Sequence, residues 1–495
     1  MLAERLSRVH AQCQETVAGF DIAAELESVL QGVGLSAADS GGSVEFQGQD
    51  PIVPSVLRLA SAAGIGLAAK SVGIAKLWRL RGGKPQDISI DLGQALHRLS
   101  PFYERKWELL NGYPPGMPSD PTCPFMPRFF YKTRDDRHVL ALNIYPRLKT
   151  AALKLLRCYD DPQSVANAIR QWKAEDLEQA AEEHGLQATM VRTIEEYRRE
   201  AQFQIVARLP LIEVEKIGDS APEPLPWNGN SPLDGIRALG LGHVIAGSGV
   251  GRALALHGAD VLNVWRPSEF EFDLLYYTAN VGMRSTTLEL GEKEGLQRFK
   301  SLLRDADILF ANRRFGWLQK FGLSASETAE IRPGIIHANI TLHGEEGPWK
   351  NRIGFDQSAG AVTGILALEG TPQTPKLPAI FVVNDYLVSW LTAVGIIAAL
   401  ERRATEGGSY RVHVSLARVA LWIQTLGIFD KSYARALAGS APDHLYRPPN
   451  LFTADTPCGI YQGVTEQVRM SETPGQYRTV LVPRGSSRPE WLSRG

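Results

Sequence analysis

The chain of 495 residues contains only four cysteines and shows no excess of charge of either sign. Cys13, Cys123, Cys158 and Cys458 lie far apart and form no Cys-x-x-Cys pair, which argues against a disulfide framework or a zinc site. The 53 basic residues nearly balance the 54 acidic residues, so no overall field attracts nucleic acid or an anionic membrane surface. We therefore expect no metal site, no nucleic-acid partner and no membrane partner.

Long apolar segments are also missing from the sequence. No run approaches the roughly 18 apolar residues that a transmembrane helix requires. The first residues, MLAERLSRVHAQCQETV, lack the apolar core of a secretory signal, and the final Ser-Arg-Gly differs from the peroxisomal Ser-Lys-Leu ending. Together with unpaired thiols, these features predict a cytoplasmic protein.

The length suggests about three domains, and changes in composition indicate their boundaries. Residues 1–50 are interpreted as an N-terminal extension that ends in the loop SAADSGGSVEFQGQDP. Residues 221–235 lie in GDSAPEPLPWNGNSPLDG, whose prolines and glycines are typical of a linker. This linker would separate residues 51–220 from residues 236–430, and residues 431–495 would form a C-terminal tail.

Residues 244–265, VIAGSGVGRALALHGADVLNVW, predict a strand, a glycine turn, a helix and a second strand. This βαβ outline is typical of a nucleotide site in a doubly wound parallel sheet. NAD would require a carboxylate at the end of the second strand, where it would hold the ribose hydroxyls. Arg266 follows Trp265 at that place, and arginine suits a phosphate. We therefore expect a phosphate-bearing ligand other than NAD.

Further arginines follow segments that we interpret as strands. Arg284 follows TANVGM, and Arg313 and Arg314 follow ADILFAN. If each segment is a strand of one parallel sheet, these side chains gather at its carboxyl edge, where such folds bind ligands. A solvated loop position is the alternative for each arginine taken singly.

Four segments in a fixed order carry a resemblance to a known family. They read HVIAGSGVGRALALHGADVLNVWRP, NVGMRSTTLEL, ADILFANRRFGWLQKFGLS and IIHANITLHGEEGPWKNRIGFDQSAGAVTGI. From about residue 232 to about residue 425, the chain resembles the family III CoA-transferases of the CaiB–BaiF type. The resemblance implies a Rossmann-like, doubly wound parallel sheet with a smaller α+β domain. It also implies coenzyme A and acyl-CoA as substrates, a carboxylic acid acceptor and no permanently bound cofactor.

The resemblance places the family's nucleophile at Asp385, which opens the helix in VVNDYLVSWLTAVGIIAAL. A carboxylate can attack an acyl-CoA thioester and expel the thiolate, giving an acyl-aspartyl anhydride and then an aspartyl-CoA thioester. Capping of the following helix is the alternative role for this side chain. By position, the resemblance implies coenzyme A contacts at Val244, Ala246, Arg266, Arg284 and Arg314.

Two other functions stay open. The family includes α-methylacyl-CoA racemases, whose Gly-His-Asp segment supplies a second base. Here the segment is Gly354-Phe355-Asp356, and because phenylalanine cannot take a proton, a transferase is favoured. His337 and His343 lie outside this motif and are interpreted as structural or surface residues. Family transferases of the formyl-CoA type carry a glycine-rich loop after the strand matched by VHVSL, and no glycine run follows it here, so an acyl-CoA-binding paralogue without turnover is the second alternative.

The N-terminal half resembles a second, partial copy of the same family segment. Residues 73–96 and 395–421 share a Gly-Ile pair, an amphipathic helix, a Gly-Gly turn and an alternating strand. Extending this match upstream places Ala63 opposite Asp385, so the first copy would lack the nucleophile. Because family subunits interlock as dimers, we expect a homodimer or an intramolecular pseudo-dimer in which the first copy supplies segments that the second lacks.

Overall fold

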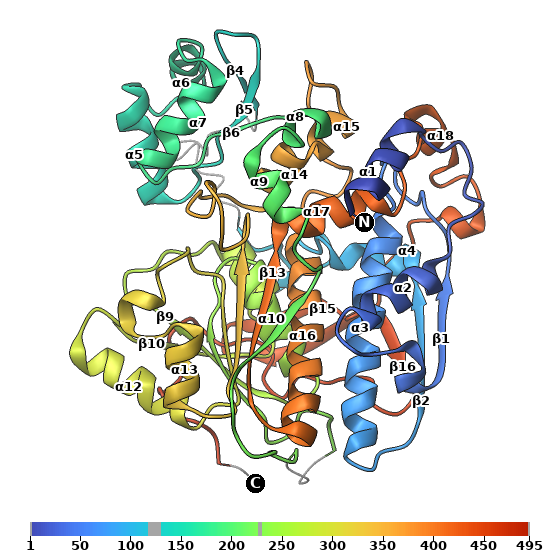
Figure 1. Ribbon diagram of the computed structural model, residues 1–495, viewed down its shortest axis with the longest axis vertical. Helices are drawn as coiled ribbons and strands as arrows, with labels where there is room; N and C mark the ends of the chain where they lie inside the picture. The colour runs from blue at the N-terminus through green and yellow to red at the C-terminus, as the bar shows by residue number, and fades with distance from the viewer. Residues whose placement is uncertain (1, 117–129, 226–229, 494–495) are drawn as a thin grey trace.

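The computed structural model describes residues 2–116, 130–225 and 230–493, and its largest element is a seven-stranded sheet (Figure 1). Six strands run parallel, and a seventh pairs antiparallel at one edge. In spatial order they are β10 (Arg284–Thr287), β9 (Asp260–Trp265), β8 (Arg237–Leu241), β11 (Ile308–Ala311), β12 (Ile336–Thr341), β13 (Ser409–Ser415) and the antiparallel β7 (Glu213–Gly218). The order reverses between β8 and β11, and ligands of open parallel sheets bind in the crevice at the carboxyl ends of such strands.

Helices cover both faces of this sheet. Alternate residues of β8 point to opposite faces, so Ala238 joins the core beneath α10 and α16, whereas Leu239 joins the core beneath α12. The helices on the two faces are α10 (Ala246–Ala255) and α16 (Asp385–Glu406) on one, and α12 (Lys293–Arg304) and α13 (Ala325–Ile331) on the other. The predicted mixed α/β class with a large, mostly parallel sheet is therefore confirmed.

The first predicted strand of residues 244–265 is wrong. The strand β8 ends at Leu241, and α10 begins at Ala246, so the apolar Val244 and Ile245 form the connecting turn. Val244 has a φ of 58°, a backbone conformation that no strand contains. The second predicted strand is confirmed as β9.

The three glycines that follow lie inside α10 rather than in a turn before it. A Cβ atom at Gly249 would lie 2.9 Å from the Cβ of Ser389 on α16, and one at Gly251 would lie 2.8 Å from the Phe310 ring on β11. A Cβ atom at Gly247 would lie 2.5 Å from the side-chain Cγ of Asn312. The glycines therefore let α10 pack closely against the sheet and α16.

The interpretation of TANVGM as a strand is also wrong. This segment spans the end of α11 (Asp273–Ala279) and the loop that precedes β10. Arg284 is consequently the first residue of its strand and lies at the amino edge of the sheet. The prediction for ADILFAN is confirmed, because β11 ends at Ala311 and Arg313 follows it at the carboxyl edge.

A smaller α+β unit, built by the N-terminal half, lies over the carboxyl edge of the large sheet (Figure 1). Its helices pack on one short antiparallel sheet and share one apolar core. The elements are β4 (Phe130–Lys132), β5 (His138–Leu140), β6 (Thr189–Met190), α5 (Pro146–Leu156), α6 (Pro162–Ile169) and α7 (Ala174–Glu183).

The helix α3 (Leu59–Leu80) packs lengthwise against α16, and each of the two helices has 22 residues. A Cβ atom on Gly66 would lie 3.1 Å from the Trp390 ring, and one on Gly73 would lie 2.8 Å from Ile397. The two helices also lead into similar elements: α3 into β2 (Gln86–Asp91) and α4 (Leu92–Ala95), and α16 into β13 and α17 (Leu416–Thr425). The segment Leu59–Leu80 is thus one continuous helix, and most of its residues are buried.

The predicted linker does not divide two sheets. The strand β7 precedes residues 221–235 in the chain, yet it completes the large sheet, whose other strands all follow them. Residues 219–225 and 230–236 contain no helix or strand. Both sides of the linker therefore share one sheet.

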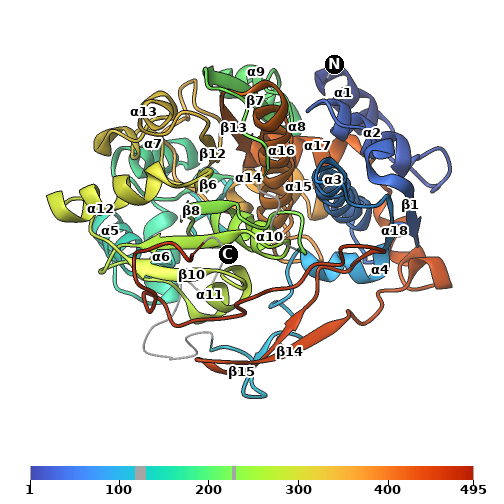
Figure 2. The same cartoon turned by 90° about the horizontal axis from the view of Figure 1, so that it is seen from below.

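The C-terminal tail connects the two halves of the molecule. Two of its three strands pair with N-terminal strands, and beyond them the chain passes beside β10, where the Ser487 N–H donates to the Ser285 carbonyl at 2.7 Å (Figure 2). The strands are β14 (Leu451–Thr456), β15 (Gly459–Val464) and β16 (Val468–Met470), with the partners β3 (Leu109–Leu110) and β2; β1 (Gly41–Gln47) lies on the other side of β2.

The remaining helices are short, and one of them, Asp356–Thr363, is buried along its whole length. They are α1 (Leu2–Ala11), α2 (Ile22–Gln31), α8 (Ile194–Tyr197), α9 (Ala201–Val206), α14 (Asp356–Thr363), α15 (Ile365–Glu369) and α18 (Lys431–Leu437). In the part of the chain that the structure describes, no helix combines the length and hydropathy needed to cross a membrane.

Candidate functional site

Asp385 is the first residue of α16 and is 7% exposed. Its carboxylate has no hydrogen-bond partner among residues 2–116, 130–225 and 230–493. Burial raises the pKa of this carboxyl well above its ordinary value, and the nearby Asp356 carboxylate raises the pKa further. A buried acid with a strongly shifted pKa at the carboxyl edge of a parallel sheet is typical of a functional group.

Asp356, and not Asp385, caps the start of α16. One carboxylate oxygen of Asp356 accepts hydrogen bonds from the backbone N–H groups of Val383 at 3.1 Å, Asn384 at 2.5 Å and Asp385 at 3.1 Å. Burial raises the pKa of Asp356 to about 6, although the three N–H groups act in the opposite direction. Because Asp356 fills the capping role that was the alternative for Asp385, the Asp385 carboxylate is left without a structural task.

The turn that carries Val244 lies beside the start of α16. The Ser389 hydroxyl, one helical turn after Asp385, lies 2.8 Å from the carbonyl oxygen of Ala246 and 2.8 Å from that of Asp385. Ala246 is itself buried as the first residue of α10, whereas Val244 is half-buried. The structure therefore brings together three of the predicted site residues, Asp385, Val244 and Ala246.

Arg266 and Arg313 share one carboxylate at the carboxyl edge. The Arg266 Nη2 atom lies 3.2 Å from Glu269 Oε1, and Arg313 binds both oxygens of Glu269, with its Nη2 atom 3.1 Å from Oε2. Although burial alone would raise the pKa of Glu269, the hydrogen bonds and charge of Arg313 lower it to about 2. Two of the arginines at this edge are thus held in place by an internal anion.

Arg314 differs from these two arginines. It is exposed, and its guanidinium has no hydrogen-bond partner in the described part of the chain. Partial burial lowers the pKa of Arg314, and the neighbouring positive charge of Arg266 lowers it further. Gly185 at the end of α7 faces it, since a Cβ there would lie 3.5 Å from Arg314 Nη1. An anion between Arg314 and Arg266 would relieve this repulsion.

The structure does not bring Arg284 to this site. Its guanidinium forms a bidentate pair with Asp260 at 2.8 and 3.0 Å and donates to the Glu490 carbonyl at 2.8 Å. Asp260 and Arg284 are the first residues of β9 and β10, so the pair lies at the edge opposite Asp385. Arg284 therefore links the sheet to the C-terminal tail.

Tyr145, from the N-terminal half, reaches the same edge of the sheet. Its hydroxyl donates to Glu271 at 2.7 Å, and its ring stacks on Phe355 with centroids 5.9 Å apart. Sequence reasoning missed this residue because no local pattern links it to Glu271, 126 positions further along the chain. The pair of carboxylates Glu269 and Glu271 after β9, and the aspartate of Gly-Phe-Asp, were signals that could have been followed.

The two histidines near the Gly-Phe-Asp motif lie in structural positions. His337 is buried on β12, with its Nδ1 atom 3.0 Å from the Thr328 hydroxyl. His343 is buried with its ring 5.3 Å from that of Trp349. Burial lowers the pKa of both residues, to about 4 for His337 and about 3 for His343.

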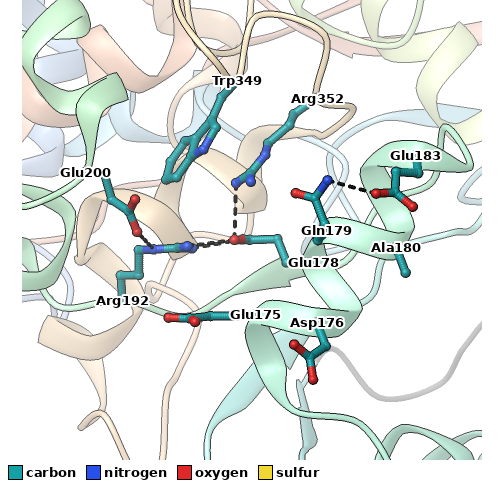
Figure 3. A pocket seen from close by; sticks show the side chains of 10 residues that line it. All are labelled: Glu175, Asp176, Glu178, Gln179, Ala180, Glu183, Arg192, Glu200, Trp349 and Arg352. Atoms are coloured by element: carbon teal, nitrogen blue, oxygen red, sulfur yellow. Dashed lines mark hydrogen bonds and ion pairs between the residues drawn. The ribbon is translucent and has the colours of Figure 1, made fainter.

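A separate pocket of about 480 Å³ lies where α7 meets the C-terminal half (Figure 3). Arg192 binds Glu178 at 2.8 and 2.6 Å, and Arg352 Nη1 lies 3.1 Å from the same carboxylate. Both guanidinium groups lie over the Trp349 ring, 4.9 and 4.1 Å from its centroid. None of the predicted site residues lines this pocket, and its buried ion pairs anchor the smaller α+β unit to the C-terminal half.

Comparisons with known proteins agree with these observations. Residues 233–467 match the family model described as CoA-transferase family III. The chain is 29% identical over 327 residues to the acetyl-coenzyme A transferase nodX of Hypoxylon pulicicidum, covering 61% of this chain and 55% of that protein. It is 30% identical over 242 residues to the alpha subunit of the succinyl-CoA–L-malate CoA-transferase of Chloroflexus aurantiacus, covering 45% of this chain and 56% of that subunit.

One solved structure, a CAIB/BAIF family protein from Brucella suis, is 25% identical and covers 47% of this chain and 65% of that chain, with a TM-score of 0.37. The chain spans about half the length of the curated relatives it matches, 55% and 56% for the two named here. The match to CoA-transferase family III thus covers residues 233–467 of this chain.

Proposed function

We propose that the protein is a CoA-transferase that moves coenzyme A from an acyl-CoA donor to a carboxylic acid acceptor through Asp385. The observation that carries this proposal is the Asp385 carboxylate, which is buried at the start of α16 and has no hydrogen-bond partner in the described part of the chain. A structural aspartate at this position would cap the helix, but Asp356 does so instead. The names of the two relatives suggest acetyl-CoA and succinyl-CoA as the first donors to test.

The proposed reaction proceeds by covalent catalysis and needs neither metal nor redox cofactor. An Asp385 oxygen attacks the thioester carbonyl carbon, the C–S bond breaks, and the thiolate leaves behind an acyl-aspartyl anhydride. The thiolate then attacks the Asp385 carbonyl carbon, which releases the donor acid and forms an aspartyl-CoA thioester. The acceptor carboxylate repeats these two steps in reverse, so that the acceptor leaves as its CoA thioester and Asp385 is regenerated.

Burial of Asp385 serves this chemistry in two ways. In the buried site, the carboxylate already lacks the hydration shell that it would otherwise have to lose before attack. The raised pKa also sets the pH range of activity, because only the ionised form is a nucleophile. Activity is therefore expected to fall as the pH decreases through the raised pKa.

We place the phosphates of coenzyme A at Arg314 and Arg266, at the crevice where the strand order reverses, as in a doubly wound sheet. The repulsion between these two guanidinium groups supports this placement. The thioester end would pass the Val244 turn to reach Asp385, because Ser389 links that turn to the start of α16.

We further propose that the chain is an intramolecular pseudo-dimer of a partial and a fuller copy. The parallel pairing of α3 with α16, and the similar elements that follow each helix, support this arrangement. Asp50 accepts hydrogen bonds from Ala60 at 3.1 Å and Ser61 at 2.7 Å at the start of α3, much as Asp356 does at α16. Ala63 takes the place of the nucleophile, which leaves one transferase site for each chain.

Racemisation is the less favoured function. The Phe355 ring stacks on Tyr145 where a racemase would hold its second base, and phenylalanine accepts no proton. A racemase would exchange the α-proton of its acyl-CoA with solvent deuterium and leave CoA on the same acid.

The experiment that tests the proposal traps the covalent intermediate. The protein is incubated with acetyl-CoA or succinyl-CoA and a panel of carboxylic acids, and the aspartyl thioester is captured with hydroxylamine or borohydride and located by mass spectrometry. We expect Asp385→Asn to abolish the adduct and to lower turnover roughly a thousandfold or more. Asp455 on β14 is exposed, so the Asp455→Asn variant serves as the matched control and should retain both the adduct and full turnover.

The opposite results would redirect the assignment. Full turnover by the Asp385→Asn variant would refute the nucleophile. Exchange of the α-proton without CoA transfer would identify a racemase, and CoA binding without an adduct on any donor would identify the binding paralogue.

A further inference from the structure

A chain of contacts connects the N-terminal half to the turn beside Asp385. We propose that Tyr145 and Glu271 are positioning residues that hold the Val244 turn in its acyl-CoA-binding conformation. The half of the protein without a nucleophile would thereby set the affinity of the other half for coenzyme A. This inference rests on the proposed function, because the turn contacts coenzyme A only if the site is the one described above.

Glu271 uses both carboxylate oxygens to make the connection. Its Oε1 atom accepts from the Tyr145 hydroxyl at 2.7 Å and from the Phe272 N–H at 3.0 Å. Its Oε2 atom accepts from the Val244 N–H at 2.9 Å. The Nε2 atom of His243 also lies 3.5 Å from Oε2. The residue is 8% exposed, so this carboxylate depends on protein groups in place of water.

The Val244 backbone needs such support. A φ of 58° is strained for a residue branched at Cβ, and a conformation of this kind persists only when its surroundings hold it. On the other side of the turn, the Asn312 side chain accepts from the His243 N–H at 2.9 Å and donates to the His243 carbonyl at 2.8 Å. The turn is thus fixed from β11 by Asn312 and from the N-terminal half by Tyr145 through Glu271.

Tyr145 is well placed to act as a fixed point. It precedes α5, whose first residue is Pro146, so the backbone at this position is restricted. Its ring packs against Phe355 at 5.9 Å and Phe272 at 5.2 Å, and the side chain is 9% exposed. Burial, together with the neighbouring Glu271 carboxylate, raises the pKa of Tyr145 well above its ordinary value, so the hydroxyl stays protonated and donates to Glu271.

The test replaces only the hydroxyl. Tyr145→Phe keeps the packed ring and removes the donor to Glu271, so we expect the Kd for free coenzyme A, measured by calorimetry, to rise about tenfold. The KM for acyl-CoA should rise in parallel while kcat changes less than about twofold, as expected for an interaction made equally before and during reaction. Tyr461→Phe, which loses a buried hydroxyl bonded to the Tyr277 carbonyl, is the matched control and should leave the Kd unchanged.

A double-mutant cycle separates positioning from packing. If Tyr145 acts through Glu271, adding Tyr145→Phe to Glu271→Ala should weaken coenzyme A binding no further than Glu271→Ala alone. The inference would be overturned if the fold-changes in Kd of the two single variants multiply in the double variant, or if Tyr145→Phe leaves the Kd unchanged. If Glu271→Ala does not fold, Glu271→Leu takes its place in the cycle, and Tyr145→Phe is judged on its own Kd.

Hydrogen exchange gives a readout that does not depend on catalysis. The Val244 amide should exchange slowly in the wild type and several-fold faster in Tyr145→Phe, whether or not any donor is turned over. Faster exchange in a protein that fails to bind coenzyme A would leave the positioning intact and refute the proposed function. Unchanged exchange in a protein that does bind coenzyme A would refute the positioning alone.

Discussion

Substitution of Gly249 by alanine tests how α10 and α16 are held together at the site. In the interior of a helix, alanine is favoured over glycine by about 1 kcal/mol. Here the added Cβ would lie 2.9 Å from the Ser389 Cβ and closer still to its hydroxyl oxygen, and 3.5 Å from the Tyr386 ring. Overpacking of a filled core costs about 1–3 kcal/mol and here involves atoms close to the backbone of α16.

Because these contacts involve atoms next to the backbone of α16, we take an overpacking cost of about 2–3 kcal/mol, which exceeds the gain of about 1 kcal/mol in helix propensity. We therefore expect Gly249→Ala to lower the free energy of unfolding by about 1–2 kcal/mol. Because the clash pushes on the first turns of α16, transferase activity should fall as well. Urea denaturation followed by circular dichroism measures the first effect, and turnover with acetyl-CoA or succinyl-CoA measures the second.

Two variants make the reasoning refutable. Ser389→Gly removes the contacted Cβ, so in the double variant Gly249→Ala should cost less than it does alone. Gly360→Ala in α14, whose nearest neighbour would be the flexible end of Leu366 at 3.3 Å, should be close to neutral. A Gly249→Ala protein as stable as the wild type, or strictly additive costs in the double variant, would show that close packing is not what this glycine provides.

Further predictions concern charged residues at the two edges of the sheet. Asp356→Asn removes the charge that raises the pKa of Asp385 while burial remains, so the acid limb of the kcat/KM profile should move to lower pH. Asp356 itself has a raised pKa in the fold, so its contribution to stability declines as pH rises through about 6, and this dependence should be absent from unfolding curves of the variant. Arg314→Gln should weaken coenzyme A binding about tenfold and reduce its salt dependence, as measured by calorimetry at two ionic strengths. Arg284→Gln should leave that Kd unchanged and lower the denaturation midpoint, because its pair with Asp260 lies at the other edge of the sheet.

The elements that the sequence predicted correctly are those with strong local patterns. The strand β11 is a continuous apolar run, β9 is apolar except for Asp260 and Asn263, and α16 begins where the apolar segment after Asp385 begins. The start of α10 in the segment VIAGSGVG was predicted incorrectly because glycine occupies three alternate positions, and each glycine disfavours a helix by about 1 kcal/mol relative to alanine. Close contacts with Ser389, Phe310 and Asn312 override that preference, and they are tertiary contacts that no local pattern contains.

Arg284 shows a second limit of sequence reasoning. An arginine next to an apolar segment lies at one edge of a sheet if it follows the strand and at the other edge if it precedes it. TANVGM contains too few residues to distinguish a strand from a helix end followed by a loop. Because one short element was assigned incorrectly, Arg284 was predicted at the carboxyl edge of the sheet, although it lies at the amino edge.

The electrostatics of the site depend on a pairing that becomes visible only in three dimensions. The guanidinium groups of Arg266, Arg313 and Arg314 and the carboxylate of Glu269 together carry two net positive charges. Glu269 does not neutralise the positive charge of the site. Because its carboxylate binds Arg266 and Arg313, the two arginines can lie close together when no phosphate is bound, and their N–H donors keep a fixed orientation. Arg314, which has no carboxylate partner in the described part of the chain, is the residue on which an incoming phosphate would gain most.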